Sequence, residues 1–366
     1  MSATIHFGIV GCGYFGSGFA RTISKLEGVK TVAVHGGTRA QSLADELGCD
    51  AYENLEEMLV RSDLDAIIVA SPNHAHKEAV VMAAKYGKHV FCEKPFALSI
   101  ADCDEMIAAC RDNGVVLMAG HIMHFMNGVQ QVKRWIEAGE IGRPIVIHAE
   151  RTGWEERQRE VSWKKQLNSS GGHLFHHIHE LDFLQAIMGP AVSVSTAGGN
   201  LAHSGEGFGD EDDVLLVTLE FAGGTVGTMQ YGSGFRWGEH FVKINGTEGA
   251  ILLDMEQSSV ILKKGKETIR FGLNDTSEED AVRMETYQRK SGGVFYGTKD
   301  TALPLHLGKL MKKEISCFRD AILGWPIEKQ YERLFNGSAA RSSVATAEAA
   351  MNSLREKRWM TIEWSN

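Results

Sequence analysis

The stretch of sequence that decides the fold is IHFGIVGCGYFG, residues 5–16. A mainly apolar run, Ile5–Val10, ends in a glycine-rich turn, and the turn leads into a segment of helical periodicity, Phe15–Leu26. A strand, a turn and a helix in this order begin a βαβ unit. The turn has the spacing GxGxxG, whose glycines allow backbone N–H groups at the helix N-terminus to approach a pyrophosphate. In this context the stretch predicts a dinucleotide-binding site.

The first 120 residues continue to alternate between strand and helix patterns. Further strands are expected at 31–34, 65–70, 89–92 and 115–119, and helices at 40–47, 76–86 and 100–113. Each strand is apolar along its length, which is typical of a parallel sheet covered by helices on both faces. The sequence therefore predicts an α/β, doubly wound Rossmann domain over residues 1–122.

The pattern changes after about residue 122. Helices at 129–138 and 172–188 accompany segments of alternating polarity at 145–151, 214–221, 226–231, 241–245, 250–254 and 259–263. Such alternation indicates an antiparallel sheet with one open face, and Gly223-Gly224 indicates a hairpin turn. Residues 123–366 are predicted to form an α+β domain for substrate binding and oligomerisation, with a large open, mainly antiparallel sheet. Its exposed face is either an oligomer interface or simply solvated. Two late helices, 307–322 and 337–356, complete the chain, and the last is expected to pack on the Rossmann domain.

The composition excludes several classes of protein. Of the 366 residues, 43% are hydrophobic and 23% charged, as in ordinary globular proteins. The net charge of −9 argues against nucleic acid or an anionic membrane as partner. No apolar run reaches the roughly 18–20 residues of a membrane span, and no signal peptide is recognisable. The six cysteines show no CxxC spacing, so they are expected to be reduced, in the cytoplasm.

The end of the second strand bears on the choice of cofactor. An NAD site usually places Asp or Glu there, to accept hydrogen bonds from the ribose hydroxyls. Here the sequence is VAVHGGTRA, residues 32–40, without an acid, and Thr38 and Arg39 are suited to a 2′-phosphate. NADP is therefore favoured over NAD. Two other roles for Arg39 stay open: a solvated residue at the start of the next helix, or a residue stacked on adenine with NAD bound.

Two further motifs make the chain similar to a known family. Residues 71–76 read SPNHAH, and residues 90–99 read VFCEKPFALS, with Glu93-Lys94-Pro95 at the end of a predicted strand. In a Rossmann domain this resembles the signature of the Gfo/Idh/MocA family, oxidoreductases related to glucose–fructose oxidoreductase and inositol dehydrogenase. INGTEGAILLD, residues 244–254, and the closing helix extend the resemblance over nearly the whole chain.

The resemblance implies an activity and a set of binding residues. The activity is transfer of hydride between NAD(P) and a secondary hydroxyl or ketone of a sugar, glycoside or cyclitol, in a homodimer or homotetramer. Lys94 would contact the nicotinamide ribose and relay the hydroxyl proton, helped by a lowered pKa. With the motifs above, the expected cofactor-binding residues are Gly11, Gly13, Tyr14, Phe15, Gly16, Thr38, Arg39, Ser71, Pro72, Asn73, His76, Glu93, Lys94 and Pro95.

Four histidines stand close together in GGHLFHHIHELD, residues 171–182. The family's catalytic helix generally ends in His-x-x-Asp, which His179 and Asp182 match. It also has an aspartate four residues before this histidine, where this chain has Phe175. His179 is the expected general acid–base, oriented by Asp182. Since residues three apart share a helix face, His176 is expected to replace the missing carboxylate.

Other uses of these imidazoles stay open. His173, His177 and Glu180 have a spacing compatible with a divalent metal, toward which His121 and His124 would converge. The alternatives are hydrogen bonds to sugar hydroxyls and packing inside the helix. The expected substrate-binding residues are His121, Trp163, Lys164, His176 and Asp182, with Trp154 and Lys165 as weaker candidates. The acidic run 210–213 is expected to be a solvated turn.

Two other functions also stay open. One is redox-assisted elimination or hydrolysis of a glycoside, in which a transient keto group acidifies a neighbouring C–H and the cofactor is regenerated. The other is a non-catalytic, dinucleotide-binding regulator. The sequence determines neither the substrate nor the direction of the reaction.

Overall fold

The computed structural model describes residues 4–288 and 303–363. The chain folds into two compact units. Of the described residues, unit 1 comprises those up to Ile122, Leu303 and Leu307–Arg341. Unit 2 comprises residues 123–288, Pro304–His306 and the residues from Ser342 onward. Within the described ranges, no helix combines the length and the apolar composition needed to cross a membrane.

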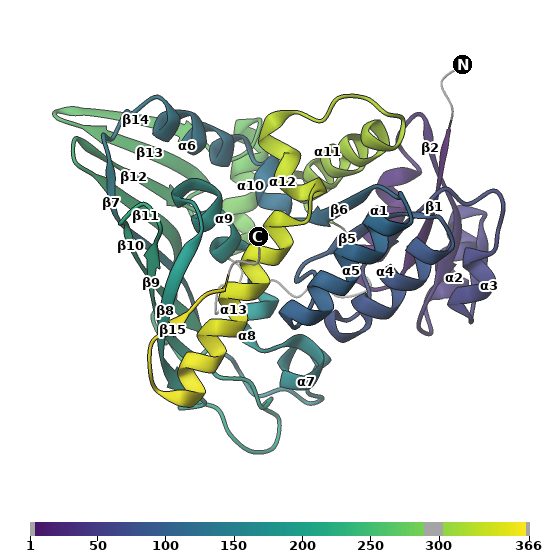
Figure 1. The fold of residues 1–366 in the computed structure, drawn as a ribbon, viewed down its shortest axis with the longest axis horizontal. Helices are drawn as coiled ribbons and strands as arrows, with labels where there is room; N and C mark the ends of the chain where they lie inside the picture. Colours follow the sequence, from purple (N-terminus) through teal and green to yellow (C-terminus); the bar gives the residue numbers. More distant parts are fainter. Residues whose placement is uncertain (1–3, 289–302, 364–366) are drawn as a thin grey trace. The chain divides into compact units, whose positions relative to one another are not determined.

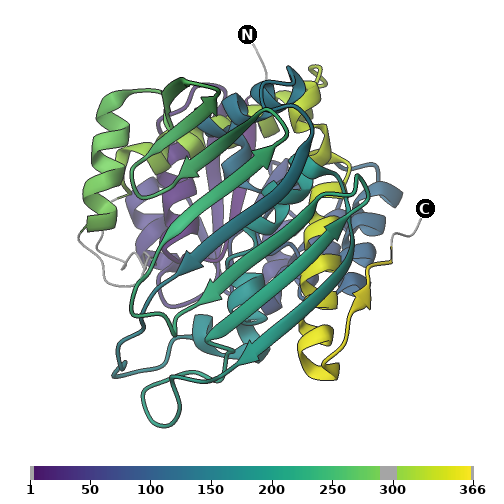
Figure 2. The ribbon, with the colours of Figure 1, turned by 90° about the vertical axis from the view of Figure 1, so that its left-hand side faces the viewer.

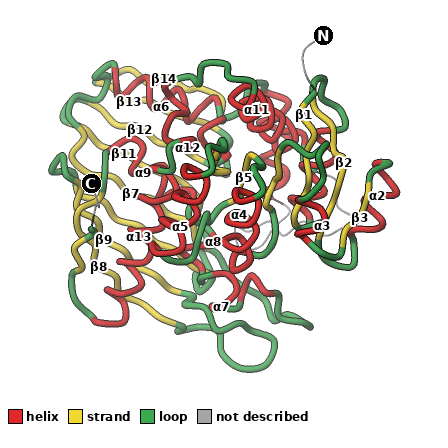
Figure 3. The backbone as a smooth tube through the Cα atoms, turned by 45° about the vertical axis from the view of Figure 1, so that its right-hand side comes forward, coloured by secondary structure: helices red, strands yellow, loops and turns green. Residues whose placement is uncertain are grey.

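Unit 1 contains a six-stranded parallel sheet with the strand order β3-β2-β1-β4-β5-β6. Figure 3 labels β1, β2, β3 and β5 of this sheet. The strands are β1 (Ile5–Val10), β2 (Val29–His35), β3 (Asp50–Tyr52), β4 (Ala66–Val69), β5 (His89–Glu93) and β6 (Leu117–Gly120). The helices are α1 (Tyr14–Ile23), α2 (Ala40–Leu47), α3 (Leu55–Leu59), α4 (His76–Lys85), α5 (Ile100–Asp112), α11 (Leu305–Ile322, from Leu307 onward) and α12 (Glu332–Phe335). The chain order reverses between β1 and β4, where open α/β sheets bind ligands beyond the carboxyl ends of their strands. The predicted Rossmann fold is confirmed.

Aromatic side chains fix α1 and α11 on one face of this sheet. The ring of Phe318 on α11 lies 6.0 Å from Phe7 on β1 and 6.0 Å from Phe91 on β5. Phe19 on α1 lies 5.2 Å from the same Phe91. All four side chains are buried. The helix after the glycine turn and the late helix α11 therefore share one core.

Unit 2 contains a nine-stranded sheet in the order β14-β13-β12-β11-β7-β10-β9-β8-β15. The strands are β7 (Pro144–Thr152), β8 (Ala191–Gly199), β9 (Val214–Phe221), β10 (Val226–Gly232), β11 (His240–Gly246), β12 (Gly249–Asp254), β13 (Ser259–Lys264), β14 (Glu267–Gly272) and β15 (Met360–Thr361). All pairs are antiparallel except β7 with β10, which is parallel. The mainly antiparallel sheet and the hairpin turn at Gly223-Gly224, between β9 and β10, are confirmed.

The helices of unit 2 are α6 (Asn127–Glu137), α7 (Leu167–Ser170), α8 (His173–His176), α9 (His179–Met188), α10 (Ser277–Gln288) and α13 (Ser338–Glu356, from Ser342 onward). Of these, α6, α8 and α9 pack against strands on one face of the nine-stranded sheet. Figure 1 shows α6 and α9 beside the strands on this face. Figure 2 shows the opposite face with its strands in front. Val146, Leu216 and Val226 share that open face by register and are 38–45% exposed.

The helix predicted over 172–188 is two helices, and the prediction of one is wrong. α8 ends at His176, and His177 leaves the helical region with φ −112° and ψ 40°. α9 then begins at His179. Because the chain changes direction between them, His176 and His179 do not share the helix face that a spacing of three implies.

Candidate functional site: a dinucleotide cradle and two histidine-rich helices

The glycine turn between β1 and α1 leaves room for a phosphate. A side chain at Gly11 would place its Cβ 2.5 Å from the Ser71 nitrogen, and one at Gly16 would place it 1.8 Å from the Gly11 oxygen. Above Gly13, in contrast, no described heavy atom lies within 4 Å of such a Cβ. Gly13 is also the N-cap of α1, and no side chain caps the helix there. The turn thus fits a pyrophosphate held by backbone N–H groups at the start of α1.

Two loops at the carboxyl edge of the sheet are tied together by His76. Its Nδ1 lies 2.9 Å from the Pro95 oxygen and its Nε2 3.0 Å from the Ser71 oxygen. Burial lowers the pKa of His76 to about 4, so the ring is neutral and donates one of these two bonds. Ser71, Pro72 and Asn73 are therefore held next to the Glu-Lys-Pro turn.

Lys94 follows β5 in a turn with a cis peptide before Pro95. The Lys94 side chain is half-buried. Its backbone N–H donates to Glu93 Oε2 at 3.1 Å. Burial raises the pKa of Glu93 to about 7, against the opposing effect of the Lys94 charge. The predicted catalytic lysine thus stands beside a buried carboxyl group at the edge where ligands bind.

The residues expected at the adenosine ribose are exposed to solvent. Thr38 and Arg39 are exposed, after Gly36 and Gly37 with φ of 108° and 73°. The His35 ring turns back to the Tyr52 carbonyl, 3.1 Å from Nδ1. No acidic side chain ends β2, as predicted.

In unit 2, the histidine-rich segment divides into buried and half-buried rings. His173 and His177 are buried, whereas His176 and His179 are half-buried. The His176 ring lies 5.9 Å from the Trp163 ring and 4.8 Å from the His177 ring. His176 and His179 are therefore the members of the segment that a ligand can reach, and Trp163 belongs with His176.

Lys164 is a half-buried lysine next to Trp163. Burial lowers its pKa to about 8. Its neighbour Lys165 is different: its Nζ lies 2.9 Å from Glu155 and 2.6 Å from Glu211, and it is 3% exposed. Lys164 is thus suited to bind an anion or move a proton, and Lys165 to hold loops together.

The acidic run 210–213 is not the solvated turn that was predicted. Glu211 pairs with buried Lys165, and Asp213 is 1% exposed. The Asp213 carboxylate accepts the backbone N–H groups of 201–203 at 2.7–2.9 Å. Buried carboxylates need such donors. The acidic run therefore connects the backbone of residues 201–203 with Lys165, which also pairs with Glu155.

Asp182 is engaged by a residue from another element. Its Oδ2 lies 2.6 Å from Nε2 of His124, and both side chains are buried. Lys133 Nζ lies 2.9 Å from Nδ1 of the same ring. Because an ammonium only donates, Nδ1 accepts and Nε2–H donates to Asp182. His121, the other expected partner, is buried after β6 in unit 1.

Glu180 is the centre of a buried polar network rather than a metal ligand. Its carboxylate accepts the Tyr231 hydroxyl and His240 Nε2 (2.6 Å), and Arg151 lies 3.4 Å away. Tyr287 contacts the other nitrogen of His240 at 2.8 Å. Across residues 4–288 and 303–363, no three His, Cys, Asp or Glu side chains gather as a metal site would require. The alternative set of His173, His177 and Glu180 does not form one.

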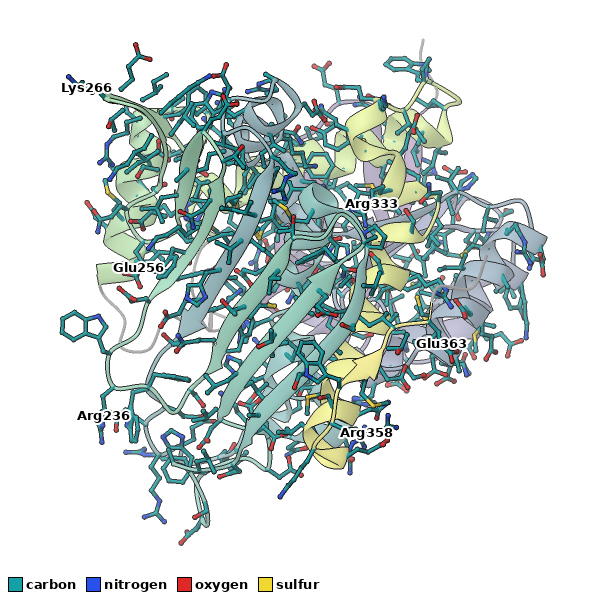
Figure 4. All side chains as sticks on the ribbon, turned by 60° about the vertical axis from the view of Figure 1, so that its left-hand side comes forward. Arg236, Glu256, Lys266, Arg333, Arg358 and Glu363 are labelled. Atoms are coloured by element: carbon teal, nitrogen blue, oxygen red, sulfur yellow. The ribbon has the colours of Figure 1, made fainter. Side chains whose placement is uncertain are left out.

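Trp154, a weaker candidate for stacking on a sugar, is already covered. The guanidinium of Arg236 lies 3.6 Å from the centre of its ring, and His203 lies 4.5 Å away on another side. Figure 4 shows Arg236 in the loop that follows β10. A cation over an indole face is a favourable arrangement by itself, so this tryptophan needs no ligand to explain it.

The chain combines two units. One is a Rossmann unit with the open glycine turn and the Glu-Lys-Pro turn, and the other is built on an open nine-stranded sheet. This combination defines a class of dinucleotide-binding oxidoreductases. The family described as "Oxidoreductase family, NAD-binding Rossmann fold" matches residues 5–121. Its companion, "Oxidoreductase family, C-terminal alpha/beta domain", matches residues 133–362. The chain belongs to the Gfo/Idh/MocA family, and the resemblance seen in the sequence is confirmed.

Two relatives cover nearly the whole chain. The 2,7-anhydro-N-acetylneuraminate hydratase of Escherichia coli (strain K12) is 44% identical over 98% of this chain and 97% of that protein. The protein of the same name from Mediterraneibacter gnavus is 43% identical over 97% and 96%. Among solved structures, levoglucosan dehydrogenase in complex with NADH matches with a TM-score of 0.80, covering 99% of this chain and all of that one. At 19% identity, that last match shows the fold alone.

Proposed function

We propose that the chain hydrates an anhydro-bridged sialic acid and that its dinucleotide is reduced and reoxidised within each turnover. The observation that carries the proposal is the pairing of two facts. Two relatives at 43–44% identity are named as hydratases, and hydration involves no net redox change. Yet this chain has the open glycine turn at Gly11–Gly16 and the Glu93-Lys94-Pro95 turn, to which we assign dinucleotide binding and hydride transfer. This is the redox-assisted alternative raised by the sequence.

The chemistry of such a substrate explains why a hydration needs a hydride acceptor. In 2,7-anhydro-N-acetylneuraminate, an oxygen bridges C2 and C7, C3 is a methylene group and C4 bears a hydroxyl. When bound, the dinucleotide accepts the hydride of C4 and later returns it. Oxidation gives a C4 ketone, which makes the C3 proton acidic, and loss of that proton expels the bridging oxygen from C2. Water then adds at C2, a proton returns to C3, and reduction of the ketone gives N-acetylneuraminate.

The proposed route moves more protons than a simple dehydrogenation does, and three half-buried side chains, Lys94, His176 and His179, match these protons in number. A simple dehydrogenase moves the hydroxyl proton alone, whereas this route also moves the C3 proton and one at the bridging oxygen or the attacking water. We assign the hydroxyl proton to Lys94, with His179 and His176 for the two others. Lys164, with its pKa lowered to about 8, is assigned to the substrate carboxylate. Trp163, 5.9 Å from His176, is assigned to the sugar ring.

Turnover of 2,7-anhydro-N-acetylneuraminate in D2O tests this route. With a sub-stoichiometric amount of NAD, NMR is expected to show N-acetylneuraminate with about one deuterium at C3 per turnover and protium retained at C4. Protein stripped of dinucleotide is the control and should be inactive until NAD is added. Product without deuterium at C3 would indicate direct hydrolysis, and NADH formed in proportion to substrate would indicate a simple dehydrogenase.

Net dehydrogenation of a sugar, glycoside or cyclitol, the reaction that the sequence favoured, is the second candidate. Membership of an oxidoreductase family supports it. The same D2O experiment decides between the two reactions.

We also propose that the open sheet face, with Val146, Leu216 and Val226 exposed, joins copies of the chain in a homodimer or homotetramer. The cytoplasmic location stays a prediction. All six cysteines are free in the structure.

The preference for NADP stays a prediction, and Arg39 tests it. Arg39→Ala is expected to weaken NADPH binding about tenfold and NADH binding less than about twofold, because a lost charge-assisted bond to phosphate is worth roughly 1.5 kcal/mol. The measurement is a fluorescence titration of each reduced dinucleotide, with exposed Lys85→Ala as the control. Equal weakening of both would mean that Arg39 stacks on adenine, and no change would mean that it is solvated.

A further inference from the structure

Glu314, in the middle of α11, is a buried carboxyl group. Its side chain is fully buried, and within the described ranges neither oxygen has a hydrogen-bond partner. Burying a polar group without hydrogen bonds is unfavourable, and more so if it is charged. A hydrophobic residue would fill this place in α11 at less cost to stability. Glu314 therefore calls for a role other than packing.

The packing of α11 on the sheet locates this carboxyl group. Phe318 is one helical turn after Glu314, so the two share a face, and Phe318 packs on Phe91 of β5. Glu93 is two residues after Phe91 and points to the same face of the sheet. Burial is the main cause that raises the pKa of Glu314, and the charge of Glu93 raises it further. Two buried glutamates therefore lie near each other at the carboxyl edge of β5.

The two carboxyl groups differ in what stabilises their charged forms. Glu93 accepts the backbone N–H of Lys94, and the Lys94 ammonium favours its ionised form. Burial and the charge of Glu93 both raise the pKa of Glu314 well above the usual range, and among the described residues no positive charge opposes them. Cys92 on β5 and Cys317 on α11 stay neutral, because burial raises both thiol pKa values, and His76 is neutral too. Of the pair, Glu314 therefore holds its proton more firmly.

We propose that Glu93 and Glu314 form a carboxyl pair that retains one proton beneath the dinucleotide site, and that dinucleotide binding is linked to this proton. With the proton on Glu314, Glu93 is the single counter-charge of Lys94. Loss of the proton would place a second negative charge at the edge that must accept an anionic pyrophosphate. Glu314 is thus a positioning residue that acts through Glu93 on Lys94. The inference rests on the proposed function only for the identity of the ligand.

The test compares NADH binding across pH in wild type, Glu314→Gln and Glu328→Gln. Glutamine keeps the shape of Glu314 in its protonated form, and exposed Glu328 is the matched control in the same unit. From pH 6 to pH 9 we expect the dissociation constant to rise about tenfold in wild type and in Glu328→Gln, and less than about threefold in Glu314→Gln. Equal slopes in all three proteins would overturn the proposal.

Thermal unfolding without ligand gives an independent readout. When the pKa of a carboxyl group is higher in the folded than in the unfolded chain, the protein becomes less stable as pH rises from the unfolded pKa toward the folded pKa. The melting temperature of Glu314→Gln should therefore match wild type near pH 5 and exceed it by about 2–4 °C at pH 8. Glu314→Met serves if the glutamine variant does not fold. If the melting temperatures of Glu314→Gln and wild type differed by the same amount at every pH, Glu314 would ionise freely in the folded protein. If wild type binds no NADH, the proposed function fails, while this measurement still decides the state of Glu314.

Discussion

Replacement of Lys94 by alanine is expected to lower turnover of the anhydro sugar by about 10²- to 10⁴-fold, the usual contribution of a positioned acid–base group. Lys94 is half-buried and its backbone is fixed by the bond to Glu93. NADH binding should change by less than about tenfold, because we assign the pyrophosphate to backbone N–H groups near Gly13 and not to Lys94. Turnover is measured by NMR of the product and binding by NADH fluorescence.

The matched control is Lys85→Ala, which removes an exposed lysine from the end of α4 in the same unit. It should leave both turnover and binding unchanged. If Lys94→Ala kept full function, the non-catalytic regulator would become the better interpretation of this chain. If it lost NADH binding altogether, Lys94 would be a binding residue and the proton would have to move through another group.

The features that could be predicted from the sequence are those that depend on neighbours along the chain. β1 and α2 have the predicted bounds, because the apolar run before the glycine turn and the periodicity of Ala40–Leu47 are local patterns. β3 and α3 were not predicted. β3 has three residues at the sheet edge and α3 has five, which is too short for periodicity to show.

The partners of the site residues could not be predicted, because they come from distant parts of the chain. Asp182 was expected to orient His179, and its bond to His124 joins residues 58 apart in sequence. The bond between Glu180 and His240 joins residues 60 apart. The pairing of Lys165 with Glu211 likewise depends on the meeting of two loops. The sequence shows which segments carry these chemical groups, but it does not indicate which of the groups meet.

One missed residue did leave a signal. Leu310, Glu314 and Phe318 are spaced four apart in α11, so they form one stripe on the helix. A glutamate between a leucine and a phenylalanine of a buried stripe breaks the amphipathic pattern. Conflicts of this kind between local pattern and burial tend to mark functional positions. In this chain the conflict falls beneath the motif that the family resemblance singled out.

Replacement of Glu180 by alanine is expected to lower the free energy of unfolding by about 3–5 kcal/mol, because it leaves a buried charge without its partner. Burial opposes ionisation of Glu180, but Arg151 and His240 hold its pKa well below the usual range. Its removal leaves the Arg151 guanidinium and the Tyr231 hydroxyl without their acceptor. The measurement is urea unfolding, with Glu156→Ala, an exposed neighbour on the same unit, as control. A loss below about 1 kcal/mol would contradict a central role for this carboxylate.

The same network bears on catalysis through position alone. Glu180 follows His179 in the first turn of α9 and bonds to side chains of β10 and β11, so it fixes where that helix begins. Glu180→Gln keeps the shape and removes the charge, and it should lose stability and turnover together. Lys94→Ala should lose turnover at unchanged stability. Measuring stability and turnover on both variants therefore distinguishes the role that we propose for Lys94, on the substrate, from the role of Glu180, which holds the start of α9 in place.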